Sequence, residues 1–187
     1  TFEYFVIPAI LKKKEREADP IIRIWSAGCS TGEEPYTIAL LCKELLPAEY
    51  RLEILASDSN REAIRKAERG IYPESAVAGI PGRYLRRYFL HTSRGYKVRD
   101  AVREPVTFLH GDFRDASGLT AQDIVFFRNV SMYYADSVQR SMLETLWKSM
   151  DVDSYLFLGE SESIFGLDSG YEFVHTDWST LFRKRGL

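Results

Sequence analysis

The residues best suited to chemistry in this 187-residue chain are polar groups that follow apolar runs. Glu34 lies shortly after the run that ends at Ala27, Asp58 ends the run RLEILASD, and Asn129 stands near the end of the run DIVFFRNV. Carboxylates at such positions repel phosphates but suit a ligand that has hydroxyl groups and a positive charge. An acidic residue at the end of the second strand of an α/β domain can accept hydrogen bonds from ribose hydroxyls. The pattern therefore predicts a site for a ribose-containing ligand.

The stretch that positions these groups begins with an apolar, β-branched run, Ile21–Ala27, which predicts a buried strand. Small residues follow, and Gly28 would let a ligand approach the backbone of this turn. A helix is then predicted from about Glu33–Leu46. We expect Ser30 or Thr31 to cap it, because a glutamate follows at the capping-box spacing. A strand that turns tightly into a helix N-terminus is typical of nucleotide- or cofactor-binding α/β domains.

The later elements predict an α/β fold, with a mostly parallel sheet and helices on both faces. The predicted strands are Arg51–Asp58, Val106–Leu109, Asp123–Val130, Tyr155–Gly159 and a final strand or hairpin within Phe173–Arg183. The predicted helices are Thr1–Lys14, with a charged and solvated end at Lys12–Glu17, then Arg61–Gly70 and Asp136–Met150. Residues 72–104 break this rhythm with prolines and glycines, so we expect a small inserted subdomain with an antiparallel piece. We expect residues 1–187 to form one domain.

Composition narrows the classes of function. The formal net charge is −2 and no long basic block occurs, so we do not expect a nucleic-acid partner. No apolar run approaches the ~20 residues of a membrane span, and no signal-peptide pattern opens the chain. Two cysteines cannot form a disulfide framework, and the scattered histidines favour neither a metal site nor a histidine-based triad. We expect a cytoplasmic protein without a metal.

Each candidate residue also has a purely structural interpretation. Glu33 and Glu34 could simply stabilise the helix dipole, and only one of them needs to face a ligand. Asp58 could merely cap the helix that follows it. Tyr133 and Tyr134 are by default packing residues with exposed hydroxyl groups. These interpretations stay open at the level of sequence.

The signatures of phosphate-binding sites are incomplete. The first turn lacks the full G-x-G-x-x-G spacing, and no G-x-x-x-x-G-K-[ST] occurs anywhere. In an open α/β sheet, ligands bind outside the carboxyl ends of the strands, where Asp58, Asp112 and Asn129 are predicted to converge. S-adenosylmethionine has a ribose, an ammonium and a sulfonium but no phosphate. It therefore fits the predicted site.

Several short motifs resemble one family, in its order and with similar spacing. WSAGCSTGEEPYTIA, ASDSNREAIRKAERGIY, RRYF, FFRNVSMYY and LFLGESES together are similar to the CheR family, chemotaxis-type protein-glutamate O-methyltransferases. The resemblance covers nearly the whole chain, from Trp25 to Lys184. It implies the Rossmann-like fold of class I S-adenosylmethionine-dependent methyltransferases. It also implies that S-adenosylmethionine is the cofactor and S-adenosylhomocysteine the product, with methyl transfer to glutamate side chains of chemoreceptor-type proteins.

The resemblance implies roles for individual residues. Tyr133 matches the tyrosine close to the transferred methyl group and is the expected catalytic residue. Asp112 stands where the family usually has an asparagine near the adenine. The turn Gly159–Ser163 has Glu160 in place of the usual histidine, and we assign it no catalytic role. The implied cofactor-binding residues are Ala27, Gly28, Glu34, Asp58, Asp112, Phe113, Asn129 and Val130.

The resemblance also bears on partners. The family's catalytic domain follows a small helical domain and a T-x-F-F-R-like motif, and this sequence begins after that motif, so we expect the helical domain to be absent from it. Either the chain is a fragment or this member lacks the motif. The loop from His91 to Tyr96 is short, which implies binding to the cytoplasmic domain of the receptor without a grip on a C-terminal pentapeptide. We also expect a monomer. Two alternatives stay open, a methyltransferase with another substrate and a non-catalytic regulatory domain of the same fold.

Overall fold

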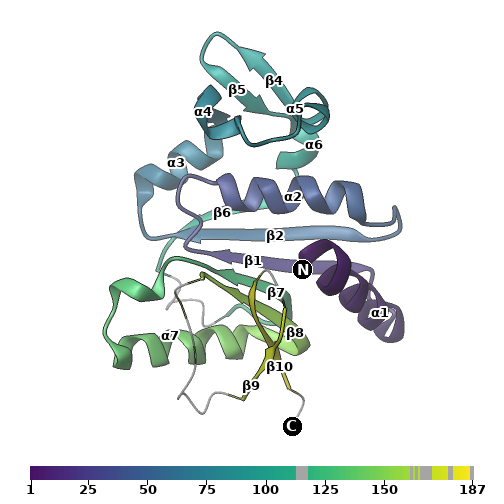
Figure 1. Ribbon diagram of the computed structural model, residues 1–187, viewed down its shortest axis with the longest axis vertical. Coiled ribbons are helices and arrows are strands. Elements are labelled where there is room, and N and C mark those ends of the chain that lie inside the picture. The colour runs from purple at the N-terminus through teal and green to yellow at the C-terminus, as the bar shows by residue number, and fades with distance from the viewer. Residues whose placement is uncertain (113–117, 161, 163, 165–169, 177–178, 186–187) are drawn as a thin grey trace.

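A seven-stranded, mostly parallel sheet forms the centre of the molecule (Figure 1). The computed structural model describes residues 1–112, 118–160, 162, 164, 170–176 and 179–185, apart from the side chain of Tyr133. The strand order is β6-β2-β1-β7-β8-β10-β9. Among these described strands, β10 alone runs opposite to the others, and it pairs antiparallel with both β8 and β9. The strands are β1 (Ile21–Ala27), β2 (Arg51–Asp58), β6 (Val106–His110), β7 (Gln122–Phe127), β8 (Met150–Leu158), β9 (Tyr171–Val174) and β10 (Thr180–Lys184).

The strand order reverses between β1 and β7. From β1 the chain proceeds outward through β2 to β6 and then places β7 on the other side of β1. The register pairs Ile21 with Arg51 on one side of β1 and Ile24 with Ile124 on the other. Because the two connections lead away from each other, the carboxyl ends of β1 and β7 are the switch point at which ligands of open α/β sheets bind.

Helices cover both faces of this sheet (Figure 1). Strand β7 shows the two-sided burial, because Ile124 and Phe126 pack in one core with α1 and α2, whereas Val125 and Phe127 pack in the other with α7. The elements outside the small sheet are η1 (Phe2–Val6), α1 (Ile7–Glu17), α2 (Glu33–Leu45), α3 (Arg61–Arg69), η3 (Ser131–Tyr133) and α7 (Asp136–Ser149). The predicted fold class is therefore confirmed. Within the described residues, no helix combines the length and apolar character needed to cross a membrane.

A second, three-stranded antiparallel sheet of order β3-β5-β4 lies beyond α3 (Figure 1). It falls in the stretch where the sequence predicted an antiparallel insertion. A connection of two residues, Ser93 and Arg94, joins β4 to β5, and Thr92 pairs with Gly95. The elements here are β3 (Ile71–Tyr72), α4 (Glu74–Val77), α5 (Gly82–Tyr88), β4 (Phe89–Thr92), β5 (Gly95–Val98) and α6 (Asp100–Arg103).

The start of α2 differs from its prediction. Gly32 precedes the helix with a φ of 93°, and no side chain caps it, so the predicted Ser30 or Thr31 cap is wrong. The Thr31 hydroxyl donates instead to the Glu33 carboxylate. A Cβ at Gly32 would lie 2.7 Å from the Cβ of Ala67, so the close packing of α3 requires glycine here.

Two lysines in the charged end of α1 are buried, so the predicted solvation of this end is wrong for them. Lys13 and Lys14 are each only 2% exposed. The Nζ of Lys13 lies 3.1 Å from Asp123 and 2.8 Å from Asp151, and the Nζ of Lys14 lies 2.9 Å from Asp123. Lys14 and Arg23 also contact Asp19, at 2.9 and 2.7 Å. We call this group the amino-end ion cluster, since it joins α1 to the starts of strands; it comprises Lys13, Lys14, Asp19, Arg23, Asp123 and Asp151.

Candidate functional site

The first turn, directly after β1, is held against the end of β2. The N–H groups of Gly28 and Cys29 donate to the carbonyl oxygen of Ser57, at 2.8 and 3.0 Å. Gly28 has a φ of +85°, and a Cβ there would lie 2.5 Å from Cγ2 of Val130. Glycine is therefore required for two reasons, the backbone conformation and the close approach of Val130. Ala27 is 1% exposed, so only its backbone can reach a ligand.

Asp58 joins the first turn to the loop after β2. Its Oδ2 accepts a hydrogen bond from the N–H of Ser30, and its Oδ1 accepts one from the N–H of Asn60, both at 2.8 Å. The cap of α3 is Asn60 itself, which accepts hydrogen bonds from Glu62 and Ala63. The structural interpretation of Asp58 as a helix cap is therefore wrong. Because a carboxylate offers about four acceptor sites, Asp58 can accept further hydrogen bonds from a ligand.

The two adjacent glutamates of α2 differ in orientation. Glu34 accepts a hydrogen bond from Oγ of Ser26 at 2.8 Å and lies 3.5 Å from the guanidinium of Arg128. Burial raises the pKa of Glu34, although Ser26 and Arg128 oppose that rise. Glu33 is exposed and bonds only locally, to Thr31, in the described contacts. Glu34 is therefore the glutamate directed toward the strand ends.

The segment after β7 faces the first turn across the switch point of the sheet. The strand ends at Phe127, three residues before its predicted end, so Asn129 and Val130 lie in a loop. Asn129 has a φ of 60°, which is uncommon for a residue other than glycine. The N–H groups of Asn129 and Val130 both donate to the carboxylate of Glu162, at 2.7 and 2.8 Å. We call residues 129–131 the β7 loop.

Glu162 belongs to the turn after β8 to which the sequence analysis gave no role. It is 4% exposed and lies among the strand ends. The available signal was weak: a second glutamate in a short turn after an apolar strand, LFLGESES. Backbone N–H groups are its partners, and every non-proline residue carries such a group, so no residue type in the sequence identifies them.

The remaining predicted residues follow either β6 or the β7 loop. Asp112 follows β6, and the N–H of the preceding Gly111 donates to the carbonyl oxygen of Asp58 at 3.0 Å. Phe113 lies outside the described residues. Tyr133 ends η3, directly after the β7 loop, and its side chain is likewise outside what the structure describes. Tyr134 is 41% exposed, as expected for a tyrosine with a solvated hydroxyl.

The thiol at this site is inert. Cys29 is 3% exposed, and burial together with the negative charge of Asp58 raises its pKa to about 12. A thiol with that pKa is protonated at neutral pH and is a poor nucleophile. Among the described residues, no group of three or more histidine, cysteine, aspartate and glutamate side chains could hold a metal ion.

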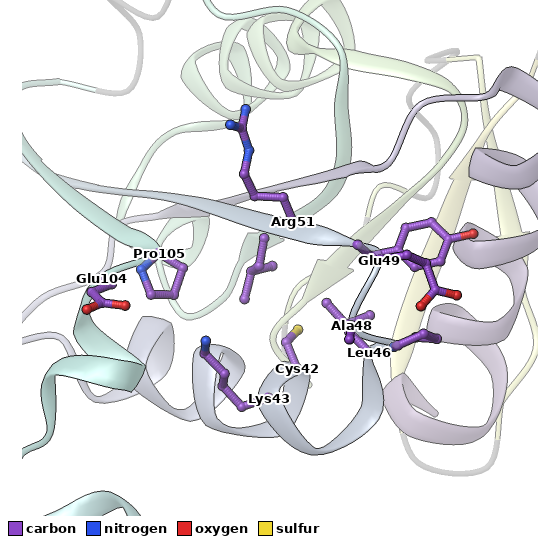
Figure 2. A pocket seen from close by; sticks show the side chains of 11 residues that line it. Cys42, Lys43, Leu46, Ala48, Glu49, Arg51, Glu104 and Pro105 are labelled. Atoms are coloured by element: carbon purple, nitrogen blue, oxygen red, sulfur yellow. The ribbon is translucent and has the colours of Figure 1, made fainter.

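A separate hollow lies at the amino-terminal end of β2, away from the carboxyl ends of the strands (Figure 2). It is lined by the end of α2 and the start of β2, including Lys43, Arg51 and Glu104. None of the predicted site residues lines it. Because ligands of such sheets bind at the carboxyl ends of the strands, this hollow is not the candidate site.

The groups at the carboxyl ends suit S-adenosylmethionine. Glu34 and Asp58 provide carboxylate acceptors for hydroxyl and ammonium groups, and the backbone donors of the β7 loop are already satisfied by Glu162. A phosphate would meet two carboxylates and no unoccupied donors at that loop. Carboxylate acceptors together with already satisfied backbone donors therefore fit a cofactor without phosphates.

Comparison with known proteins agrees with this geometry. Residues 1–180 match the family model described as CheR methyltransferase, SAM binding domain. A chemotaxis protein methyltransferase 2 from Vibrio cholerae is 35% identical over 170 residues, and a chemotaxis protein methyltransferase from Borreliella burgdorferi is 32% identical over 168 residues. The matches cover 88% and 86% of this chain and 59% of each relative, so the chain spans little more than half of those proteins.

Solved structures support the same fold. The rRNA methyltransferase AviRa from Streptomyces viridochromogenes aligns with a TM-score of 0.57 at 13% identity, covering 96% of this chain and 83% of that one. A TehB-like SAM-dependent methyltransferase from Corynebacterium glutamicum aligns with a TM-score of 0.53 at 14% identity, covering 88% and 80%. The expected cofactor, S-adenosylmethionine, agrees with the family model. The chain therefore belongs to the CheR methyltransferase family, and its residues 1–180 match that family's S-adenosylmethionine-binding domain.

Proposed function

We propose that this protein transfers a methyl group from S-adenosylmethionine to glutamate side chains of chemoreceptor-type proteins in the cytoplasm, giving glutamyl methyl esters. The observation that carries the proposal is a pair of carboxylates beside the first turn. Glu34 accepts a hydrogen bond from Ser26 in β1, and Asp58 accepts one from Ser30 in the turn that follows β1. Family membership supports the reaction class.

Under this proposal the chain's own residues bind and orient the reactants. Asp58 accepts hydrogen bonds from ribose hydroxyls, Glu34 holds the polar part of the cofactor, and Asn129 and Val130 form the facing wall, with Gly28 and Asp112 beside them. Bound S-adenosylmethionine supplies a methyl group carried on a positively charged sulfonium. Tyr133 acts at the reacting groups.

The reaction needs no general base from the protein. An unperturbed glutamate has a pKa of about 4.3, so the acceptor carboxylate is ionised at neutral pH. Catalysis then depends mainly on positioning the carboxylate in line with the methyl group and on excluding water. The inert thiol of Cys29 is compatible with such a site, since no protein nucleophile is required.

The direct test is methyl transfer to a purified receptor cytoplasmic fragment from cofactor labelled in the methyl group. We expect label that mild base releases as methanol, because glutamyl esters hydrolyse readily, and no transfer by the Asp58→Ala variant. Base-stable label would indicate another substrate class. Cofactor binding with no transfer to any receptor fragment would support the non-catalytic alternative.

The short connection between β4 and β5 supports a finer proposal about the partner. Ser93 and Arg94 alone join the paired residues Thr92 and Gly95, so little chain is available there to hold a peptide. We expect a receptor fragment that lacks its last five residues to be methylated within about twofold of the intact fragment's rate. A tenfold slower rate would contradict recognition without a pentapeptide.

A further inference from the structure

The carboxylate of Glu162 fills a concavity made of backbone N–H groups. Its Oε1 accepts hydrogen bonds from the N–H groups of Val130 (2.8 Å) and Ser131 (2.6 Å) and from Oγ of Ser131 (2.8 Å). Its Oε2 accepts from the N–H groups of Asn129 (2.7 Å) and Gly159 (2.8 Å). Burial alone would raise the pKa of Glu162, but Ser131 and the backbone donors lower it. The side chain is therefore ionised at neutral pH although it is buried.

The β7 loop has the backbone shape of an anion-binding nest. Asn129 is left-handed, with a φ of 60°, and Val130 is right-handed, with φ −115° and ψ −51°. Successive residues of opposite hand direct consecutive N–H groups toward one point, where an anion binds. Here that anion is supplied by the chain itself. Without it, three neighbouring donors would lack their partner, and a buried donor without a partner is unfavourable.

The nest lies between the first turn and the turn after β8. Val130 occupies the space that a Cβ of Gly28 would need, so the position of the β7 loop is transmitted to the first turn. On the other side, a Cβ at Gly159 would lie 2.7 Å from the Glu162 carboxylate and 3.0 Å from the nitrogen of Asn129. The carboxylate thus joins the ends of β7 and β8 and leaves little freedom to the segment that leads into Tyr133.

We infer that Glu162 is a positioning residue: by filling the nest of residues 129–131 with its carboxylate, it holds Asn129 and Val130 in the arrangement that binds the cofactor. This inference rests on the proposed placement of the cofactor against these two residues. Glu162 acts through the backbone of the β7 loop and not through contact with the ligand.

The sharpest variant is Glu162→Gln, which keeps the size of the side chain but places an NH2 group against backbone donors. Calorimetric titration with S-adenosylhomocysteine, on protein shown by circular dichroism to be folded, should give an affinity lower by at least about tenfold. The matched control is Glu160→Gln in the same turn, where the side chain is exposed. Its affinity should stay within twofold of wild type.

Chemical rescue separates positioning from a general loss of stability. Glu162→Ala leaves the nest without its anion, and we expect added formate to restore part of the affinity, whereas chloride at equal ionic strength should not. If Glu162→Gln does not fold, Glu162→Asp replaces it, with a smaller expected loss because its shorter side chain reaches fewer of the donors.

The outcomes distinguish this inference from the proposed function. Wild-type affinity in folded Glu162→Gln, alongside weak binding by Asp58→Ala, would overturn the positioning role and leave the proposed cofactor site intact. Loss of affinity that formate does not restore would also count against it. If the wild-type chain does not bind S-adenosylhomocysteine at all, both the proposed site and this inference fail.

Discussion

The two ends of the large sheet both gather carboxylates, but they satisfy them differently. At the amino ends, Asp123 is fully buried and bonds to the ammonium groups of Lys13 and Lys14. At the carboxyl ends, Asp58 and Glu162 accept hydrogen bonds from backbone N–H groups and a serine hydroxyl. The amino end pairs opposite charges, whereas Asp58 and Glu162 at the carboxyl end place negative charge against neutral donors.

This difference separates stability from binding. The amino-end ion cluster neutralises its own charges and joins α1 to the starts of β1, β7 and β8, so it has little left to offer a ligand. Carboxylates held by N–H groups keep their negative charge and, in Asp58, part of their acceptor capacity. We therefore expect substitutions at the amino end to change the free energy of unfolding, and those at the carboxyl end to change ligand affinity.

The largest effect is expected for Asp123→Ala. This change leaves two buried ammonium groups with one partner fewer each and removes the acceptor of the Arg23 N–H group. Breaking a buried ion pair from one side typically costs about 3–5 kcal/mol, and we expect a loss of that size in urea denaturation. Affinity for S-adenosylhomocysteine should be unchanged in the protein that remains folded.

Glu53→Ala is the matched control for that variant. Glu53 also pairs with arginines, Arg51 at 2.7 Å and Arg23 at 3.9 Å, but its side chain is 48% exposed. Exposed pairs contribute at most about 1 kcal/mol. Equal losses in the free energy of unfolding for Asp123→Ala and Glu53→Ala would show that burial does not explain how the cluster stabilises the protein.

The next effect is the loss of affinity in Asp58→Ala. If Asp58 receives ribose hydroxyls, removing a charged acceptor should cost about 2–3 kcal/mol, or roughly 30- to 150-fold in the dissociation constant. Tyr133→Phe removes one hydroxyl and should change S-adenosylhomocysteine affinity by less than about threefold. Titration calorimetry of both variants tests this order, and equal affinity of Asp58→Ala and wild type would contradict the assigned site.

The sequence predicted the parts of this comparison that depend on local pattern. The bounds of β1 and β2 are confirmed, because each is a continuous apolar run ended by small or acidic residues. These strands place Gly28 and Asp58, so the centre of the site followed from them. The α3 helix was also predictable, since Gly70 ends it in the left-handed conformation that glycine favours.

The parts that could not be predicted depend on distant partners. Lys13 is separated from Asp123 by 110 residues and from Asp151 by 138, so nothing local distinguishes it from a solvated lysine. Glu162 bonds to N–H groups 31 to 33 residues away, and their directions are set by the fold of the β7 loop. Only the folded chain shows that these side chains are buried and paired.

The smallest effect distinguishes Glu34 from its neighbour. Burial raises the pKa of Glu34, so the folded state holds this proton more tightly than the unfolded chain does. The ionised side chain therefore costs stability as the pH rises through the folded-state pKa. Glu34→Gln should stabilise the ligand-free protein at pH 7 by no more than about 1 kcal/mol, with a difference that shrinks toward pH 4, while affinity for S-adenosylhomocysteine falls.

Glu33→Gln is the control for that change, because Glu33 is exposed and its carboxylate accepts a hydrogen bond only from the hydroxyl of Thr31 among the described contacts. Its stability, measured by urea denaturation at both pH values, should stay within about 0.5 kcal/mol of wild type, and its affinity should not change. A destabilised Glu34→Gln at pH 7 would mean that Glu34 serves the fold as Asp123 does. The division between a stabilising amino end and a binding carboxyl end would then not hold for this residue.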